Sequence, residues 1–418
     1  MSIAWLFVVV GLAFFLAWNL GANDVANAMG TSVGSKAITL RQAIALAGVL
    51  ELTGAVFFGR EVTATLTGKI APLGLFEGQP QLFVVSIVAE LLATSLWLLF
   101  ATWRGWPVAS SHAAVGAIAA INLIAFGLNA LDGAMIRTIV VSWVLTPFAS
   151  GLLSAIFFWI LQRTVLVQPS PLERWKHWNP WLSVALVGVV GGLVFPAVVE
   201  PVAIFLEVHW NWTLPHHDYA LGLGLLGLLG LTVWTLPILN PEAEAESIVV
   251  ERQLGKFQVV SACCMAFAHG SNDVGNAVAP LASFAAFWQT QMIPVTGVVV
   301  PLWTLLLGGV GIVIGLATWG KKVIVTVGEQ LTALQPSSGF CAELGAAATV
   351  LLASRWGLPV STTHALVGSV VGVGLVQGAA SLQGATVRQI AAAWFITVPA
   401  AMALAGVVFV GLRSLLSI

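Results

Sequence analysis

The chain has 418 residues, of which 59% are hydrophobic and only 8% are charged, with a formal net charge of −1 and a mean hydropathy of +0.98. A soluble protein of this length needs far more charge to cover its surface, and this charge balance provides no basic surface for nucleic acid. The composition therefore indicates an all-α, multi-pass membrane protein. The three cysteines lie in apolar stretches and indicate no disulfide framework.

A membrane-spanning helix needs about 20 mainly apolar residues, and the sequence contains twelve such stretches. The fourth and eleventh are short and begin with Pro and hydroxyl residues, so we expect re-entrant or broken segments there rather than simple crossings. The expected segments are 3–29, 38–58, 82–103, 107–127, 138–162, 180–206, 219–239, 256–283, 294–318, 337–354, 359–378 and 388–412.

The distribution of Lys and Arg predicts the orientation of the chain. With the N-terminus outside, eleven of the sixteen Lys and Arg residues fall in the inner connections. Because inner loops carry the excess of these residues, we expect both termini on the outer side of the plasma (inner) membrane. Re-entrant hairpins at the two short segments would weaken this count.

Two polar motifs occur twice in the chain. "GANDVANA" at 21–28 returns as "GSNDVGNA" at 270–277, and the stretch 89–118 returns at 342–370. Seven expected crossings separate the copies, an odd number, which predicts an inverted internal repeat of the kind found in alternating-access transporters. Duplication retained only for packing is the alternative. The expected divisions are a first repeat at 1–162, connecting spans and a linker at 163–255, and a second, inverted repeat at 256–418.

Five carboxylates lie inside the expected spans, where each charge costs about 2.5–3.5 kcal/mol on insertion scales. No Lys or Arg lies in the middle of a span, so these groups must be protonated, hydrogen-bonded in a wet cavity or matched by a bound cation. Structural carboxylates that hold helices together are the alternative. Four of the five form two repeat-related pairs, whereas Glu51 has no acidic counterpart near residues 300–304. The five are Asp24, Glu51, Glu90, Asp273 and Glu343.

Asparagines accompany the two aspartates at helical spacing. Asn23 and Asn27 are four residues apart, and Asn272 and Asn276 repeat this step, so each pair lies along one helix face. Amide and carboxylate oxygens suit small hard cations, although asparagines also serve as contacts between helices. Glycines in both motifs predict broken helices whose freed carbonyls help to hold Na⁺. The expected sodium ligands are Asp24, Asn27, Asp273 and Asn276.

A second repeated element reads "PVASSH" at 107–112 and "PVSTTH" at 359–364. Pro followed by hydroxyl residues is typical of a helix start, and a helix N-terminus at membrane depth favours an anion. Two such termini would form a cradle for a tetrahedral oxyanion, and ordinary helix capping is the alternative. His112 and His364 could donate to the anion or orient a neighbour. The hydroxyl ligands expected are Ser110, Ser111, Thr362 and Thr363.

Placing an anion beside two aspartates without Lys or Arg creates repulsion. Cations placed between them remove it, and the anion and the cations then stabilise each other's binding. This arrangement favours cation symport. Protonation of the carboxylates would serve the same purpose, so H⁺ coupling remains open.

The doubled motif, together with "ELTG" at 51–54 and "GLPVSTTH" at 357–364, resembles the inorganic phosphate transporter (PiT) family across both halves of the chain. The resemblance implies sodium- or proton-coupled phosphate uptake, a transport domain against a scaffold, and a homodimer. It also implies that the hydroxyl loops are substrate-facing hairpins and that three glutamates, Glu51, Glu90 and Glu343, serve transport and coupling. The positions implied to bind phosphate and its cations are Asn23, Asp24, Asn27, Asn272, Asp273 and Asn276.

The sequence thus predicts a secondary active transporter that imports inorganic phosphate with sodium, without a cofactor. The same architecture could use protons, or carry sulfate or a metal–phosphate complex. An enzyme is disfavoured because the expected helices carry no nucleophile–base arrangement and no metal-ligand motif. An anion channel is disfavoured because buried carboxylates would line the path of the anion.

Overall fold

The computed structural model describes residues 3–212, 216–236, 245–295, 297–330, 334–378 and 382–418. Within these ranges the regular structure is helical and includes no β-strand. Each expected segment overlaps one α-helix, in the same order. The helices are α1 (Ile3–Gly34), α2 (Leu40–Gly68), α3 (Pro80–Arg104), α4 (Ser110–Phe126), α5 (Gly133–Leu161), α6 (Pro171–Trp210), α7 (His216–Trp234), α8 (Glu246–Thr290), α9 (Leu302–Gln330), α10 (Pro336–Arg355), α11 (Thr362–Gln377) and α12 (Gly384–Leu415).

The helices confirm an all-α membrane protein but do not establish twelve crossings. In the described parts of the chain, eight helical segments are long and apolar enough to cross a membrane. Helices α4 and α11 have only 17 and 16 residues. At 1.5 Å per residue they are about 25 Å long, less than the roughly 30 Å of a bilayer's hydrocarbon core.

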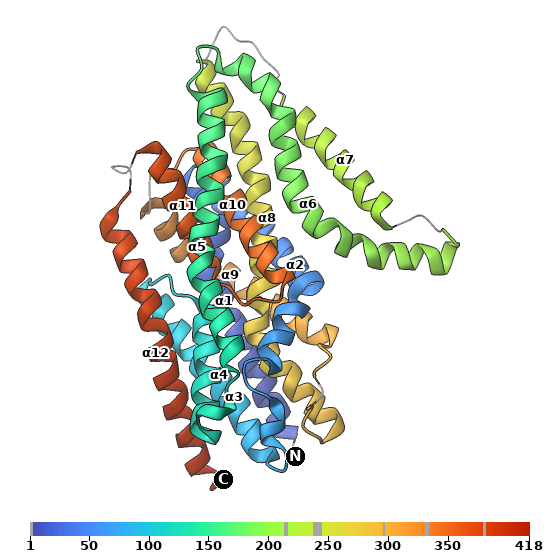
Figure 1. Cartoon of the computed structure of the whole chain (residues 1–418), viewed down its shortest axis with the longest axis vertical. Coiled ribbons are helices and arrows are strands. Elements are labelled where there is room, and N and C mark those ends of the chain that lie inside the picture. Colours follow the sequence, from blue (N-terminus) through green and yellow to red (C-terminus); the bar gives the residue numbers. More distant parts are fainter. Residues whose placement is uncertain (1–2, 213–215, 237–244, 296, 331–333, 379–381) are drawn as a thin grey trace.

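The two short helices belong to helical hairpins that meet inside the bundle. Figure 1 places α3 and α4 in its lower half and α10 and α11 in its upper half. We call residues 106–111 the first tip and residues 358–363 the second tip. The Ser111 hydroxyl donates to the Val360 carbonyl at 2.8 Å, and the Thr363 hydroxyl donates to the Val108 carbonyl at 3.4 Å. Both short segments therefore start in the interior, as re-entrant hairpins would.

Helices of one repeat pack on helices of the other repeat, and the contacts occur in equivalent pairs. Helix α1 packs on α9 and α8 packs on α2, while α4 packs on α12 and α11 packs on α5. Figure 1 shows that α1 starts at the lower end and α8 at the upper end, and that α5 and α12 run in opposite directions. This is the arrangement of an inverted repeat.

The expected helix breaks at the motif glycines are wrong, because α1 and α8 continue through both motifs. These glycines instead allow helices to touch. A Cβ on Gly21 would lie 1.9 Å from the Ile312 carbonyl oxygen, and a Cβ on Gly270 would lie 2.1 Å from that of Glu51. The breaks that do occur lie at the tips, where α3 and α10 end before α4 and α11 begin.

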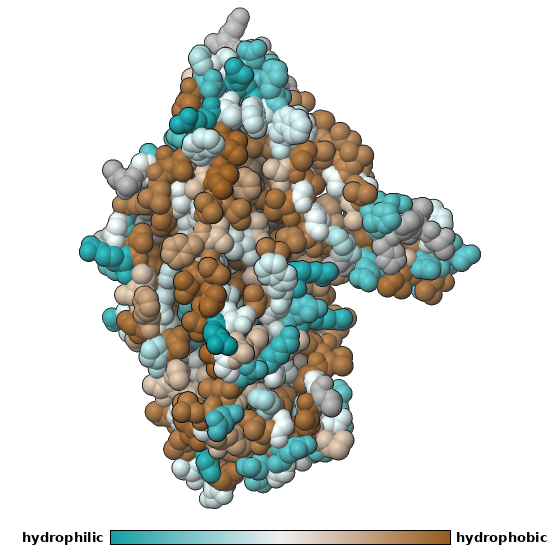
Figure 2. Space-filling view, viewed as in Figure 1, coloured by the Kyte–Doolittle hydropathy of each residue, from teal (hydrophilic) through white to brown (hydrophobic). Residues whose placement is uncertain are grey.

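The outer surface matches a lipid environment. Figure 2 shows hydrophobic residues over much of the visible face and hydrophilic residues gathered at its upper end and along its lower edge. Helices α6 and α7 pack on each other and project from the bundle, and both chain termini lie at the lower end (Figure 1). The site described next lies inside the bundle.

Candidate functional site

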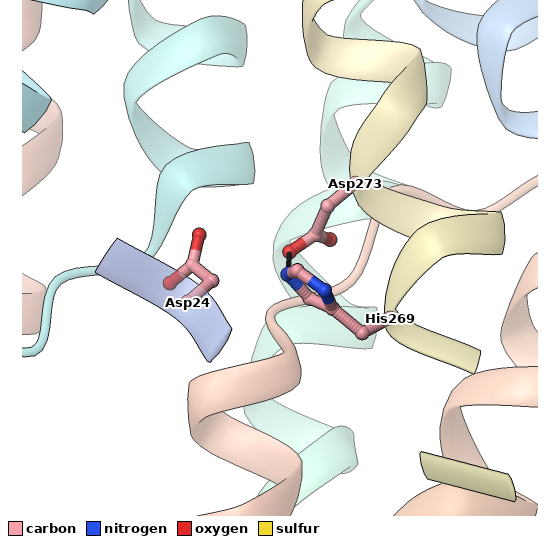
Figure 3. A group of neighbouring side chains, drawn as sticks. All are labelled: Asp24, His269 and Asp273. Atoms are coloured by element: carbon pink, nitrogen blue, oxygen red, sulfur yellow. Dashed lines mark ion pairs between the residues drawn. The ribbon is translucent and has the colours of Figure 1, made fainter. Parts of the chain in front are cut away.

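The two repeated aspartates lie close together where α1 packs against α8. Asp24 and Asp273 are 1% and 0% exposed. Ligand atoms of these two side chains and of His269 all lie within 4.8 Å of one another. Figure 3 shows the three side chains, with Asp24 on α1 and both His269 and Asp273 on α8. The fold therefore brings residues 249 positions apart in the sequence into one buried polar site.

His269 bridges two carboxylates. Its Nε2 lies 3.0 Å from Asp273 Oδ2, one helical turn further along α8, and its Nδ1 lies 3.1 Å from Glu51 Oε1 on α2. All three side chains are fully buried. A neutral imidazole can donate from only one nitrogen, so the two contacts need a second proton, either on the ring or on a carboxyl group.

This bridge has no copy in the other half of the molecule. Gly21 contacts Ile312 as Gly270 contacts Glu51, which makes Ile312 the structural counterpart of Glu51. The residue that corresponds to His269 is Leu20, three positions before the first Asn-Asp pair. Both are fully buried, so an apolar pair replaces the charged pair, and the structure explains why Glu51 has no acidic counterpart.

Several oxygens at the site accept no hydrogen bond from the described residues. They are Asn23 Oδ1, Asp24 Oδ2, Asn272 Oδ1, Asp273 Oδ1 and Asn276 Oδ1. Buried acceptors without donors are costly, and this set of carboxylate and amide oxygens is the ligand type that hard cations take. The donor set therefore fits a cation such as sodium.

The hairpin tips bring hydroxyl groups to the aspartates. The Thr362 hydroxyl donates to Asp273 Oδ2 at 3.1 Å, and Ser110, at the start of α4, lies beside Asp24. Asn27 Nδ2 donates to the Thr363 hydroxyl at 2.8 Å and to Asp24 Oδ1 at 3.2 Å. The structure thus places the expected aspartates, Asn27 and tip hydroxyls around one site, at the N-termini of α4 and α11.

The repeat-related Glu90 and Glu343 have different surroundings. Glu343 is fully buried and accepts hydrogen bonds from Ser32 at 2.6 Å and Ser261 at 2.8 Å, and also from Thr31. Glu90 instead lines a cavity of about 40 Å³ together with Asn122 and other residues. The Glu343 carboxylate is therefore tied to α1 one turn beyond the motif, whereas Glu90 faces a small space lined mainly by apolar side chains.

The histidines that directly follow the two tips, His112 and His364, contact aromatic rings; we call them the tip histidines. The His112 ring lies 3.8 Å from that of Trp143 and 4.5 Å from that of His364. The His364 ring lies 3.7 Å from that of Trp394, and its Nδ1 lies 3.2 Å from the Trp143 carbonyl. These contacts match the alternative in which the histidines orient a neighbour.

His269 is the site residue that sequence reasoning missed. It lies directly before the second motif, and the stretch reads "HGSNDVGNA" from residue 269. Its spacing of four residues from Asp273 would have indicated contact on one helix face. Glu51 and Asp273 therefore have a histidine partner, which the absence of Lys and Arg from the middle of the spans did not indicate.

An all-helical inverted repeat with a buried polar site between its halves is an architecture of membrane transporters. A profile of the phosphate transporter family matches residues 20–405. A putative phosphate permease from Pyrococcus horikoshii is 37% identical, with 97% of each chain covered. Inorganic phosphate transporter 2-1, chloroplastic, from Arabidopsis thaliana is also 37% identical, over 94% of this chain and 69% of that protein.

A solved structure titled "The sodium-dependent phosphate transporter" superposes with a TM-score of 0.85 at 34% identity, covering 98% of this chain and 99% of that one. The chain belongs to the phosphate transporter family. It is a transporter and not an enzyme.

Proposed function

We propose that the chain imports inorganic phosphate together with sodium by alternating access. The observation that carries this proposal is the pairing of two aspartates with the two tips at one buried site. Support also comes from a similar solved protein whose title names sodium dependence.

Phosphate would bind between the tips, where two helix N-termini converge. Among the described residues, no side chain caps α4 at its N-cap, Ala109, and uncapped N–H groups at a helix start are suited to an anion. The proposed phosphate-binding residues are Asn23, Asn27, Ser110, Ser111, Asn272, Asn276, Thr362 and Thr363.

Sodium would bind on the aspartate side of the same site. Thr362 already donates to Asp273 and Ser110 lies beside Asp24, yet each aspartate keeps an oxygen that has no donor among the described residues. A cation there neutralises the carboxylate charge that would repel phosphate. The proposed sodium ligands are Asp24, Asn27, Asp273 and Asn276.

The three glutamates would couple sodium binding to movement. Glu51 acts through His269 on Asp273. Glu343 joins α1 to α8 and α10 through hydroxyl groups, so a change in its charge would be felt by three helices. Glu90 faces its small cavity as the counterpart in the first repeat.

Proton coupling is the second candidate, and His269 favours it. The ring lies between two carboxylates, so a proton could move among three adjacent groups when the site changes its charge. Sodium is preferred because the oxygens without donors extend beyond this bridge to α1.

Labelled-phosphate uptake into proteoliposomes tests the proposal. An inward sodium gradient should drive accumulation, whereas a proton gradient alone or no gradient should not, and excess sulfate should not compete. Asp273→Asn should abolish accumulation. Asp218→Asn, an exposed position on α7, is the matched control and should be normal. Proton-driven accumulation would show that protons and not sodium drive uptake, and competition by sulfate would show that the site is not selective for phosphate. Gradient-independent equilibration would indicate a channel.

We also propose the divisions 1–162, 163–255 and 256–418 as first repeat, connection and second repeat, and a homodimer in the plasma membrane with both termini outside. Both termini lie at one end of the bundle, which suits the last point. Protease or thiol accessibility of terminal tags in right-side-out vesicles tests it.

A further inference from the structure

The two tips have equivalent sequences but unequal contacts. Trp143 Nε1 on α5 donates to the Pro359 carbonyl, just before the second tip's hydroxyls, at 2.9 Å. The counterpart of Trp143 is Trp394 on α12, and that of Pro359 is Pro107. Trp394 Nε1 is buried and has no hydrogen-bond partner among the described residues.

A second pair of equivalent groups shows the same inequality. Asn27 Nδ2 on α1 donates to Thr363 in the second tip at 2.8 Å. The counterparts are Asn276 on α8 and Ser111 in the first tip, and Asn276 Nδ2 is buried without a partner in the described parts of the chain. Asn272 adds a hydrogen bond to the Leu358 carbonyl at 3.1 Å. The second tip is thus held by contacts whose equivalents at the first tip are not made.

We propose that Trp143 and Trp394 are alternate latches, each holding one tip in one state of the transport cycle. The structure corresponds to the state in which Trp143 holds the second tip. In the opposite state Trp394 Nε1 donates to the Pro107 carbonyl and Trp143 releases Pro359. This inference rests on the alternating-access part of the proposed function.

The two latched states would have similar energies. A buried N–H without an acceptor is costly, and exchanging the latches moves that cost from one tryptophan to the other. Because the repeats provide equivalent groups on both sides, each state makes one set of hydrogen bonds and leaves the other set unmade. Such a pair of arrangements is bistable and needs only a small bias from bound ions to switch.

The tip histidines link the two latches. Trp143 stacks on His112 at 3.8 Å, His112 meets His364 at 4.5 Å, and His364 meets Trp394 at 3.7 Å. The four rings form a continuous row between α5 and α12. A shift of one tryptophan therefore displaces the row toward the other, which explains how only one latch closes at a time.

Thiol labelling tests the latches without phosphate or sodium, so its outcome is independent of the substrate and the coupling ion. Val108 and Val360 are equivalent, buried at 0% and 1% exposure, and lie one in each tip. Each is replaced by Cys in a background in which the three native cysteines are Ala. The rate of reaction with a water-soluble maleimide is measured in detergent, so that the reagent reaches both ends.

Trp143→Phe keeps an aromatic ring but removes the indole N–H that donates to the second tip. It should speed the labelling of Val360→Cys and slow that of Val108→Cys. Trp394→Phe should change both rates in the opposite directions. The expected size is about two- to tenfold, the contribution of one neutral hydrogen bond.

Two further variants separate a latch from a general packing role. The double variant Trp143→Phe/Trp394→Phe should return the ratio of the two rates toward that of the parent, since each state then lacks one latch. Trp181→Phe, exposed on α6, should change neither rate. Rates that change in the same direction in both single variants, or that do not change, would overturn the proposal. Intact sodium-driven uptake beside such a result would leave the proposed function standing.

Discussion

His269 bridges Glu51 and Asp273. Replacing His269 and Glu51 each by the residue at its equivalent position in the other repeat separates the structural role of this bridge from its functional role. The perturbation is His269→Leu, Glu51→Ile, and both together, which copies the Leu20–Ile312 pair. The bridge contacts are 3.0 and 3.1 Å long and fully buried. The double variant therefore places beside Asp273 the apolar pair that occupies the equivalent positions in the other half of the molecule.

The single changes should differ in cost. His269→Leu leaves the Glu51 carboxylate without its partner, and breaking a buried charge pair costs about 3–5 kcal/mol. Glu51→Ile is milder, because His269 keeps its contact with Asp273. Replacing a whole buried ion pair by hydrophobic residues is often close to neutral, so the double variant should be more stable than His269→Leu.

Thermal stability in detergent, measured as the temperature that halves the monodisperse fraction, is the assay. Since 1 kcal/mol shifts the midpoint by about 2–4 °C in domains of 150–250 residues and less in larger proteins, His269→Leu should lower it by roughly 3–10 °C. The volume-conserving Ile312→Leu is the control and should have a small effect. A double variant less stable than either single variant would refute the reasoning. Uptake should stay low in the double variant, because Glu51 is the proposed coupling group.

Three further changes test other parts of the account. Gly21→Ala should prevent assembly of a monodisperse protein, because its Cβ would lie 1.9 Å from a carbonyl oxygen of α9. Gly11→Ala, whose Cβ would have nothing within 4 Å among the described residues, should be tolerated. Size-exclusion profiles of the two variants test this difference. Thr362→Val should raise the phosphate KM by about 10- to 100-fold, the value of one hydrogen bond to a charged group, while the exposed Thr138→Val should not. Glu343→Gln should weaken the sodium dependence of uptake while preserving expression, because the amide keeps the shape but not the charge among its hydroxyl donors.

The helices and the repeat could be predicted from the sequence because both depend on the order of residues within short stretches of the chain. Apolar length located the segments, and the Pro-hydroxyl starts at Ser110 and Thr362 identified helices that begin inside the bundle. The repeated Asn-Asp motif similarly identified Asp24 and Asp273, whose proximity the fold confirms.

Features that depend on which helices pack together could not be predicted. The role of Gly270 follows from the contact of α8 with α2. The absence of a side chain at this position allows the two helices to pack closely and does not break the helix. The partner of His269 lies on α2, 218 residues away, and no periodicity reports such a distance. The unequal hydrogen bonding of Trp143 and Trp394 could not be predicted either, because both copies of the repeat have tryptophan at this position.

Reciprocal binding of phosphate and sodium tests the central claim most directly. Phosphate affinity of the purified protein is measured by equilibrium binding in sodium buffer and in choline buffer, and sodium affinity with and without phosphate. If the cation neutralises the aspartates beside the anion, each ion should raise the affinity of the other by the same factor, about 5- to 150-fold, and Asp273→Asn should remove the effect. Equal phosphate affinity with and without sodium would contradict the account.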